Sequence, residues 1–323
     1  MKQVEERYIS LLTDFGFKRI FGSAPNKDLL ICFLNSLFNG RQVVKDVKYL
    51  NPENVGDIYT DRKAIFDVYC EGENGEKFIV EMQNAYQTYF KDRALFYSTF
   101  PIREQAPKGS EWDFKLNHVY TIALLNFNMN EEAFNKEEIR HHVQLCDTAT
   151  HKIFYDKLEF IYVEIAKFNK SLDELETLYD KWLYALKNLY KLTQRPKALC
   201  DKVFDRLFEE AEIARFTPQE QREYEASKMA YRDIKNSIDT AKREGKEEGL
   251  AEGMEKGLAE GMEKGLAEGM EKGLVKGLAE GMEKGMNKRS LEIARKMLAN
   301  GMDAATVMEI TGLSESQLQQ LKG

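Results

Sequence analysis

The chain has 323 residues, of which 43% are apolar and 31% charged, and its net charge is −7 at neutral pH. This length allows one hydrophobic core of ~200 residues plus an appendage, and 19 Phe and 15 Tyr exclude a chain that is disordered throughout. No apolar run approaches the ~18 residues of a membrane span, and the opening MKQVEERYIS lacks the apolar block of a secretion signal, so we expect a cytoplasmic protein.

The first part of the chain has the pattern of a helix followed by a hairpin. Apolar residues recur every three or four positions over 29–38, which predicts an amphipathic helix that ends at Asn39-Gly40. Apolar residues then alternate over 64–72 and over 77–84. These two segments flank Asn74-Gly75, so they predict a β-hairpin with a two-residue turn.

The following segments complete an α/β pattern. Helical spacing resumes over 86–100, and two further strands are predicted over 118–127 and 160–165. Helical spacing returns from Leu172 to about Glu225. This order of elements predicts an α/β fold in which helices flank a mixed sheet.

The predicted hairpin carries polar residues inside apolar strands. Asp67 lies in the middle of the first arm, and Glu81 and Gln83 lie two positions apart on the second. Because a strand repeats every two residues, Glu81 and Gln83 leave the same face ~6–7 Å apart. Two buried acids cost desolvation energy unless a partner compensates them, and a hard divalent cation such as Mg²⁺ would do so. Such an ion can polarise a phosphoryl oxygen and activate a water molecule.

An Asp, a hairpin and then Glu-x-Gln resemble the PD-(D/E)XK nuclease core, in the variant where Gln replaces the usual Lys. The fuller resemblance is to the Rpn-type recombination-promoting nucleases, also described as PD-(D/E)XK family transposases. It covers residues 1 to about 225 and implies a restriction-endonuclease-like mixed sheet, followed by a long Gly-repeat helix and a small helical tail. The motifs that carry it are, in order, TDFGFKRIFG, LLxxFLNSL, FDVYC, VEMQ and RALFY.

The resemblance implies roles for individual residues. Asp67 and Glu81 match the metal ligands, and the main-chain carbonyl of Met82 could supply another. Gln83 takes the place of the catalytic Lys; it cannot donate positive charge or act as a base, but it can orient an attacking water. Lys18 could replace the missing charge from a neighbouring helix. The implied catalytic set is therefore Asp67, Glu81, Gln83 and Lys18, with Mg²⁺ as the cofactor.

Two helical pairs are candidates for substrate binding. Asp14 and Lys18 lie four residues apart, as do Arg93 and Tyr97, so each pair shares a helix face. Asp14 belongs to the N-terminal family motif, and Arg93 with Tyr97 could grip a phosphate. Each pair also has a simpler interpretation as a surface pair, and the two hairpin acids could form a polar island in an edge strand.

Glycine recurs at every fourth position from Gly245 to Gly285, in repeats of GLAEGMEK. As an isolated helix the repeat is poor, because each interior glycine costs ~1 kcal/mol relative to Ala. As a helix packed against a second helix the repeat is plausible, because glycines at this spacing let two backbones approach closely. An apolar period above 3.6 residues favours a right-handed supercoil. Its 10 Glu and 6 Lys exclude membrane insertion and a DNA-binding arm. We expect self-association into a homo-oligomer, with an elongated or partly disordered spacer as the alternative.

The pattern over 287–323 predicts three short helices. Asn300-Gly301 ends the first, Asp303 caps the second, and Ser314–Gln317 forms a capping box for the third. The TGLS core resembles the turn of a helix-turn-helix. The last helix has only Lys322 to neutralise phosphate, so a helical cap or a protein-docking module is the alternative to DNA contact.

These features together predict three parts: a PD-(D/E)XK nuclease-like domain over 1–225, a helical linker with the repeat over 226–286, and a helix-turn-helix-like module over 287–323. The predicted function is Mg²⁺-dependent cleavage of DNA with low sequence specificity, in recombination or in a mobile element. The alternative is a DNA-binding or scaffolding protein that keeps the fold without turnover, since Gln replaces Lys and the net charge is negative. RNA is a third candidate substrate.

Overall fold

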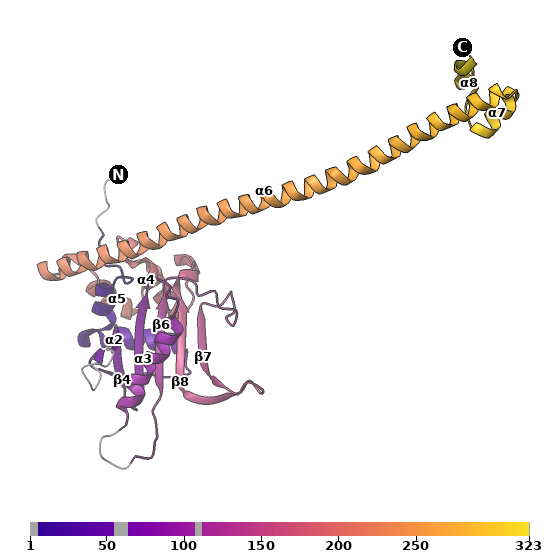
Figure 1. The fold of residues 1–323 in the computed structure, drawn as a ribbon. Coiled ribbons are helices and arrows are strands. Elements are labelled where there is room, and N and C mark those ends of the chain that lie inside the picture. Colours follow the sequence, from indigo (N-terminus) through magenta and orange to yellow (C-terminus); the bar gives the residue numbers. More distant parts are fainter. Residues whose placement is uncertain (1–5, 55–63, 107–111, 323) are drawn as a thin grey trace. The chain divides into compact units, whose positions relative to one another are not determined.

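A computed structural model describes residues 6–54, 64–106 and 112–322 (Figure 1). The chain divides into two compact units, 1–241 and 242–323. A continuous helix, α6 (Pro218–Ala299), begins in the first unit and ends in the second. None of the helices within the described ranges has an apolar stretch long enough to cross a membrane.

The first unit contains a six-stranded sheet in the order β1-β4-β5-β6-β8-β7. Its central pairs, β5 with β6 and β6 with β8, are parallel, and the other pairs are antiparallel. This mixed sheet confirms the predicted α/β class. The strands are β1 (Val47–Tyr49), β4 (Val68–Gly72), β5 (Lys77–Gln83), β6 (Val119–Leu125), β7 (Arg140–Cys146) and β8 (Ile153–Glu164), with a separate pair β2 (Glu53–Asn54) and β3 (Ala64–Ile65).

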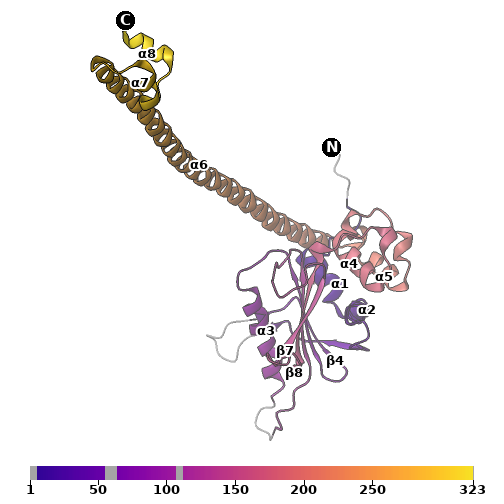
Figure 2. The same cartoon turned by 90° about the vertical axis from the view of Figure 1, so that its right-hand side faces the viewer.

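Helices cover both faces of the sheet (Figures 1 and 2). On one face lies α3 (Phe90–Glu104), and on the other lie α1 (Asp14–Phe21) and α2 (Lys27–Phe38). Beside α2 pack α4 (Leu178–Asn188) and α5 (Lys202–Glu210). The short 3₁₀ helices are η1 (Ala24–Asn26), η2 (Ile165–Lys167), η3 (Leu172–Glu174), η4 (Leu189–Lys191), η5 (Lys197–Leu199) and η6 (Ile213–Arg215).

The alternation of residues along β5 explains how these layers form. Phe78, Val80 and Met82 belong to the main core, which also contains the buried residues of α1, α2, α4 and α5. Ile79 instead packs in a smaller cluster with Phe100 of α3. Because side chains alternate between faces, Glu81 and Gln83 leave β5 on the α3 side of the sheet.

The structure corrects three details of the predicted hairpin and of the helix after it. The turn has three residues, Glu73–Gly75, because Gly72 N–H donates to the Glu76 carbonyl at 2.8 Å and Gly75 takes a φ of +82°. Asp67 lies at a bend between β3 and β4 and not inside a strand. The helix predicted over 86–100 begins only at Phe90.

The second unit ends in a small helical core. The end of α6 packs with α7 (Ala304–Thr311) and α8 (Glu315–Lys322) around Ala294, Val307 and Leu313. Asp303 caps α7, since its carboxylate accepts the N–H groups of the second and third residues of that helix. The predicted succession of three helices is therefore confirmed, although the first is the end of α6.

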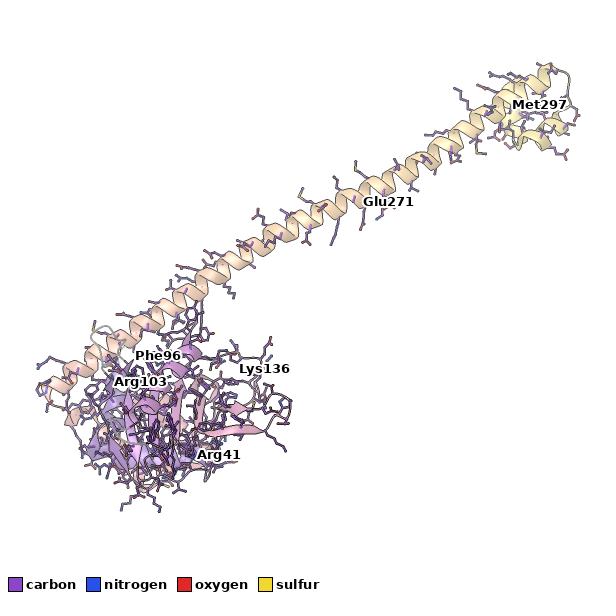
Figure 3. The ribbon with its side chains drawn as sticks, turned by 60° about the horizontal axis from the view of Figure 1, so that its bottom comes forward. Arg41, Phe96, Arg103, Lys136, Glu271 and Met297 are labelled. Atoms are coloured by element: carbon purple, nitrogen blue, oxygen red, sulfur yellow. The ribbon has the colours of Figure 1, made fainter. Side chains whose placement is uncertain are left out.

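The repeat lies in the part of α6 that belongs to the second unit, before the small helical core. Every residue from Gly245 to Gly285 is helical and exposed. Figure 3 shows the side chains of this stretch, Glu271 among them, extending away from the helix. A Cβ atom added at any of these glycines would meet no atom within 4 Å, so within the described part of the chain the repeat packs against nothing.

Candidate active site

The two acidic residues of the hairpin meet where β4 begins and β5 ends. Val68 lies opposite Val80 in the antiparallel ladder, so Asp67 and Glu81 form the next pair beyond it. The main-chain N–H of Asp67 donates to Glu81 Oε1 at 3.2 Å, and the N–H of Met82 donates to Asp67 Oδ2 at 2.8 Å. The hairpin therefore brings both predicted carboxylates to one place.

Both carboxyl groups are largely withdrawn from water. The Asp67 side chain is 20% exposed and Glu81 is 8% exposed. Burial, together with the charge of Asp67, raises the pKa of Glu81 to about 8. Burial also raises the pKa of Asp67 above its ordinary value. Two neighbouring acids in this environment resist ionising together, and a positive charge between them would remove that resistance.

A lysine of α1 faces this acid pair. Lys18 Nζ lies 2.7 Å from Asp14 Oδ1 and 3.9 Å from Asp67 Oδ1. Burial lowers the pKa of Lys18, but its hydrogen bond to Asp14 and the nearby negative charges outweigh burial, so its pKa is raised overall. Lys18 therefore lies beside the acids as a charged ammonium, with Asp14 as its closer partner.

Gln83 and Met82 present different groups to the acids. Gln83 Nε2 donates to Glu81 Oε2 at 3.3 Å, whereas the main-chain oxygen of Gln83 accepts the N–H of Asn126 at 2.8 Å. Main-chain groups point to opposite sides at successive residues of a strand. The N–H of Met82 points toward Asp67, and its carbonyl therefore leaves β5 on that same side.

Arg93 and Tyr97 come from α3, on the face of the sheet that carries Glu81. The Arg93 guanidinium lies 5.4 Å from the centre of the Phe90 ring and 5.8 Å from that of Tyr97, and its Nη1 donates to Gln87 Oε1. Its positive charge opposes the rise in the pKa of both acids. Its Nη2 is buried and has no hydrogen-bond partner within the described residues, so this donor is left unsatisfied by that part of the chain.

The available donor atoms suit a particular kind of cation. Within the described ranges, no group of three or more His, Cys, Asp or Glu side chains could hold a metal. The corner at Asp67 offers two carboxylates and a main-chain carbonyl, which are all oxygen donors. Mg²⁺ accepts such a set because it is commonly held by one or two carboxylates and keeps several waters. The residues therefore fit a partly hydrated hard cation and do not fit a structural zinc ion.

Sequence reasoning missed several polar residues around the site. Asn84 Nδ2 donates to the Leu12 carbonyl at 2.7 Å, and Asn126 Nδ2 donates to Asn84 Oδ1 at 3.3 Å. Gln87 accepts from Arg93. Asn84 and Asn126 directly follow β5 and β6, and residues at the carboxyl ends of parallel strands commonly face a ligand. That position in the sequence was the signal that could have identified them.

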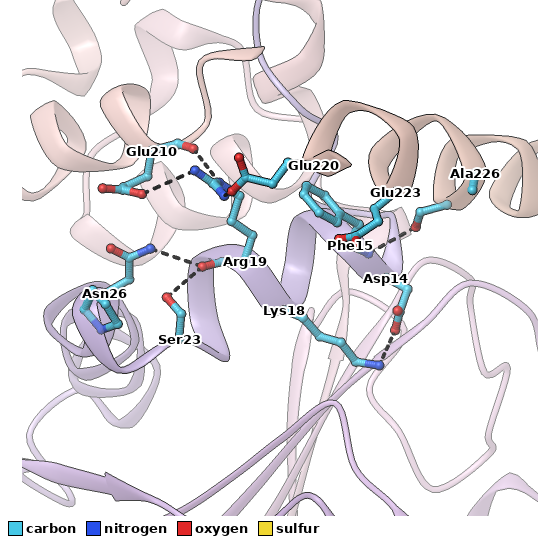
Figure 4. Close-up of a pocket in the computed structure, with 12 residues that line it drawn as sticks. Asp14, Phe15, Lys18, Arg19, Ser23, Asn26, Glu210, Glu220, Glu223 and Ala226 are labelled. Atoms are coloured by element: carbon cyan, nitrogen blue, oxygen red, sulfur yellow. Dashed lines mark hydrogen bonds and ion pairs between the residues drawn. The ribbon is translucent and has the colours of Figure 1, made fainter. Parts of the chain in front are cut away.

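A pocket of about 700 Å³ opens beside α1 (Figure 4). Asp14 and Lys18 line one part of it, and Arg19 lines another, where it bonds to the Glu210 carbonyl and to Glu220. The two hairpin acids are not among its lining residues. The acids are the candidate site because their burial and mutual charge favour a positively charged partner, whereas Arg19 is already paired.

Comparison with known families gives two matches. Residues 11–241 match the family described as PD-(D/E)XK nuclease family transposase. Residues 287–323 match the C-terminal HTH domain of the Rpn/YhgA-like nuclease family. No curated protein and no solved structure matches the chain. The first match contains every residue described above at the acid pair, and the second contains α7 and α8.

Proposed function

The chain belongs to the PD-(D/E)XK nuclease family of transposases, and from this premise we propose that it is a Mg²⁺-dependent endonuclease that hydrolyses DNA phosphodiester bonds. The observation that carries the proposal is the buried pair of Asp67 and Glu81, joined through the Asp67 N–H. When bound, the cation would polarise a phosphoryl oxygen and lower the pKa of a water molecule.

We assign one role to each residue around the acids. Asp67, Glu81 and the Met82 carbonyl would hold the cation. Gln83 stays bonded to Glu81 and orients the attacking water with its amide. Lys18 supplies positive charge beside Asp67, in place of the lysine that Gln83 replaces.

The residues farther from the acids bind the substrate. Arg93 supplies positive charge for a DNA phosphate, and Tyr97 packs beside it. Asp14 holds Lys18 in position. The match of 287–323 to an HTH domain supports DNA as the partner, and cleavage of low sequence specificity would serve recombination or a mobile element.

A second candidate function is a DNA-binding or scaffolding protein that keeps this fold without turnover. Two observations favour it: Gln83 carries no charge where the family motif has a lysine, and the chain has a net charge of −7. An RNA substrate is the third candidate, since the same site chemistry would cleave either nucleic acid.

Nicking of supercoiled plasmid in Mg²⁺ tests the proposal. We expect the wild-type protein to nick the plasmid and EDTA to abolish nicking. Asp67→Ala and Glu81→Ala should each lower the rate by about 100-fold or more, because each removes a ligand of a cation that contributes several kcal/mol. Glu73→Ala is the matched control, because Glu73 is an exposed acid at the other end of the same hairpin; it should keep the wild-type rate.

The other outcomes separate the alternatives. Equal nicking by the wild type and both alanine variants would indicate a contaminating nuclease and contradict the assignment of the site. DNA binding without nicking by any sample would favour the scaffold. The same assay with a structured RNA in place of the plasmid tests the third candidate.

A further inference from the structure

Two exposed tyrosines lie in the loop that leads away from the acid pair. This loop, 84–89, joins Gln83 at the end of β5 to the first residue of α3. Tyr86 is 53% exposed and Tyr89 is 75% exposed. Single exposed aromatic residues need no explanation, but two within four positions beside a candidate active site suggest a ligand.

Tyr89 continues a row of groups that starts at the acids. Tyr89, Arg93 and Tyr97 are spaced four residues apart at the start of α3 and so share a face. The guanidinium of Arg93 lies 5.8 Å from the centre of the Tyr97 ring, and that ring lies 5.3 Å from the ring of Phe66. Phe66 immediately precedes Asp67, so these contacts connect Arg93 and Tyr97 to the segment that carries this candidate cation ligand.

Tyr86 is held in place by packing although half of it is exposed. Its ring meets Phe127 edge to face, with centroids 5.7 Å apart and an interplanar angle of 88°. Phe127 in turn meets Phe90, the first residue of α3, with centroids 6.3 Å apart. A ring fixed in this way can stack against a flat ligand with little further loss of conformational entropy.

We propose that Tyr86 and Tyr89 form a stacking site for unpaired bases of a single-stranded or locally melted DNA, with Arg93 binding the adjoining phosphate. The proposal rests on the nuclease function proposed above. Every base has a π-face that can stack on an aromatic ring, but in a duplex these faces are covered by neighbouring base pairs. Only an unpaired strand can therefore use the two rings.

The surroundings favour a nucleotide chain over a protein partner. The exposed polar residues Gln87 and Thr88 lie between the two tyrosines in the sequence, so the loop offers polar groups as well as rings. Arg93 lies one turn beyond Tyr89, with its main-chain N–H bonded to the Tyr89 carbonyl, and its guanidinium supplies a positive charge for an anion. The two rings suit the bases of a single strand, and the polar groups and the guanidinium suit its phosphates.

Binding in EDTA tests this inference without any cleavage. The full-length protein is titrated into fluorescein-labelled oligothymidylate, into an abasic strand of equal length, and into a duplex, and fluorescence anisotropy is measured. We expect tighter binding to oligothymidylate than to the abasic strand. Tyr89→Leu keeps apolar volume without the ring and should weaken oligothymidylate binding by about tenfold, with duplex binding unchanged. Tyr89→Trp keeps an aromatic ring and should bind oligothymidylate as tightly as the wild type.

Phe154→Leu is the matched control, because Phe154 is also exposed, by 82%. It precedes the first residue of β8 that pairs with β6, and so lies at the opposite end of the sheet from Glu81. Equal oligothymidylate binding by the wild type and Tyr89→Leu would overturn the inference, as would an equal loss in Phe154→Leu. An oligonucleotide with 5-iododeoxyuridine should cross-link to Tyr86 or Tyr89 under near-ultraviolet light, and cross-links confined to 287–323 would contradict it.

The same readout separates this inference from the nuclease proposal. A protein that nicks plasmid but binds oligothymidylate and the abasic strand equally would overturn the stacking site alone. A protein with ring-dependent binding that nicks no substrate would overturn the nuclease proposal and leave the stacking site supported.

Discussion

The protonation of Glu81, which lies beside Asp67, makes the stability of the folded protein depend on pH. Burial raises the pKa of Glu81 from an ordinary value of 4.5 to about 8, so between these values the folded protein binds a proton that the unfolded chain has released. The stabilising effect of this proton is full below pH 4.5 and is lost as the pH rises through about 8. A cation that requires ionised Glu81 should bind more tightly as the pH rises through the same range.

We therefore expect the Tm of the metal-free wild-type protein to fall between about pH 5 and pH 8 relative to that of Glu81→Gln, whose amide does not titrate. Saturating Mg²⁺ should reduce this fall in the Tm of the wild type and leave the Tm of Glu81→Gln unchanged. Differential scanning calorimetry of both proteins, with and without Mg²⁺, measures the effect. Parallel Tm curves for the two proteins would contradict the raised pKa of Glu81.

The residues of the site differ in how far the sequence could predict them. The shared face of Glu81 and Gln83 follows from the two-residue period of a strand, and the meeting of Asp67 with Glu81 follows from the hairpin. The approach of Lys18 depends on how α1 packs across the sheet, which no local pattern gives; only the family resemblance pointed to it. The partnerless Nη2 of Arg93 depends on α3 packing in the same way.

Among the elements, those with a clear period were predictable and the short or edge strands were not. The apolar residues of α2 at the predicted spacing, from Leu29 to Phe38, are buried, and the helix is capped by Asn39 with a φ of +50°. The sequence did not predict β1, which has three residues, or β7, an edge strand whose residues are mostly only half-buried or exposed. The predicted strand over 64–72 divides into β3 and β4 around Asp67, whose side-chain carboxylate accepts the Met82 N–H.

The start of α6 fixes two segments that carry the site. Ser227 Oγ accepts the N–H of Phe15 at 3.0 Å, at the start of the helix that carries Lys18. Tyr231 OH accepts Asn126 Nδ2 at 3.2 Å, and the N–H of Asn126 holds the Gln83 carbonyl. These contacts connect α6 to both the lysine and the glutamine of the candidate site.

Ser227→Ala and Tyr231→Phe each remove one of these hydrogen bonds and should each lower the free energy of unfolding by about 1 kcal/mol. Both should also lower the rate of plasmid nicking at saturating DNA, because Lys18 or Gln83 loses its support, while the DNA concentration for half-maximal rate stays the same. Ser237→Ala is the control on the same helix, where the hydroxyl bonds only to its own helix at Asp233. Wild-type rates for all three variants would show that α6 does not position the site.

At the scale of the whole molecule, the repeat is a helix without a packing partner in the described chain. From Leu250 to Met286 its Leu, Met and Val side chains are 58% to 73% exposed. Its 11 interior glycines cost roughly 10 kcal/mol of helix stability relative to Ala, and burial of apolar surface at about 25 cal/mol per Å² is the term that can offset it. We propose that a second copy of the chain supplies this burial, since glycines at every fourth position let two backbones approach closely.

Truncation distinguishes this assembly role from the role of the tail. A chain that ends at Ala241 keeps the first compact unit and the whole first family match, so it should fold and retain nicking, but as a monomer. A chain that ends at Met286 keeps the repeat and lacks the HTH match, and it should remain oligomeric. Light scattering after size-exclusion chromatography gives the mass of each. If the chain ending at Ala241 has the same oligomeric state as the full-length protein, the contacts between copies lie in the first unit and the repeat is a spacer.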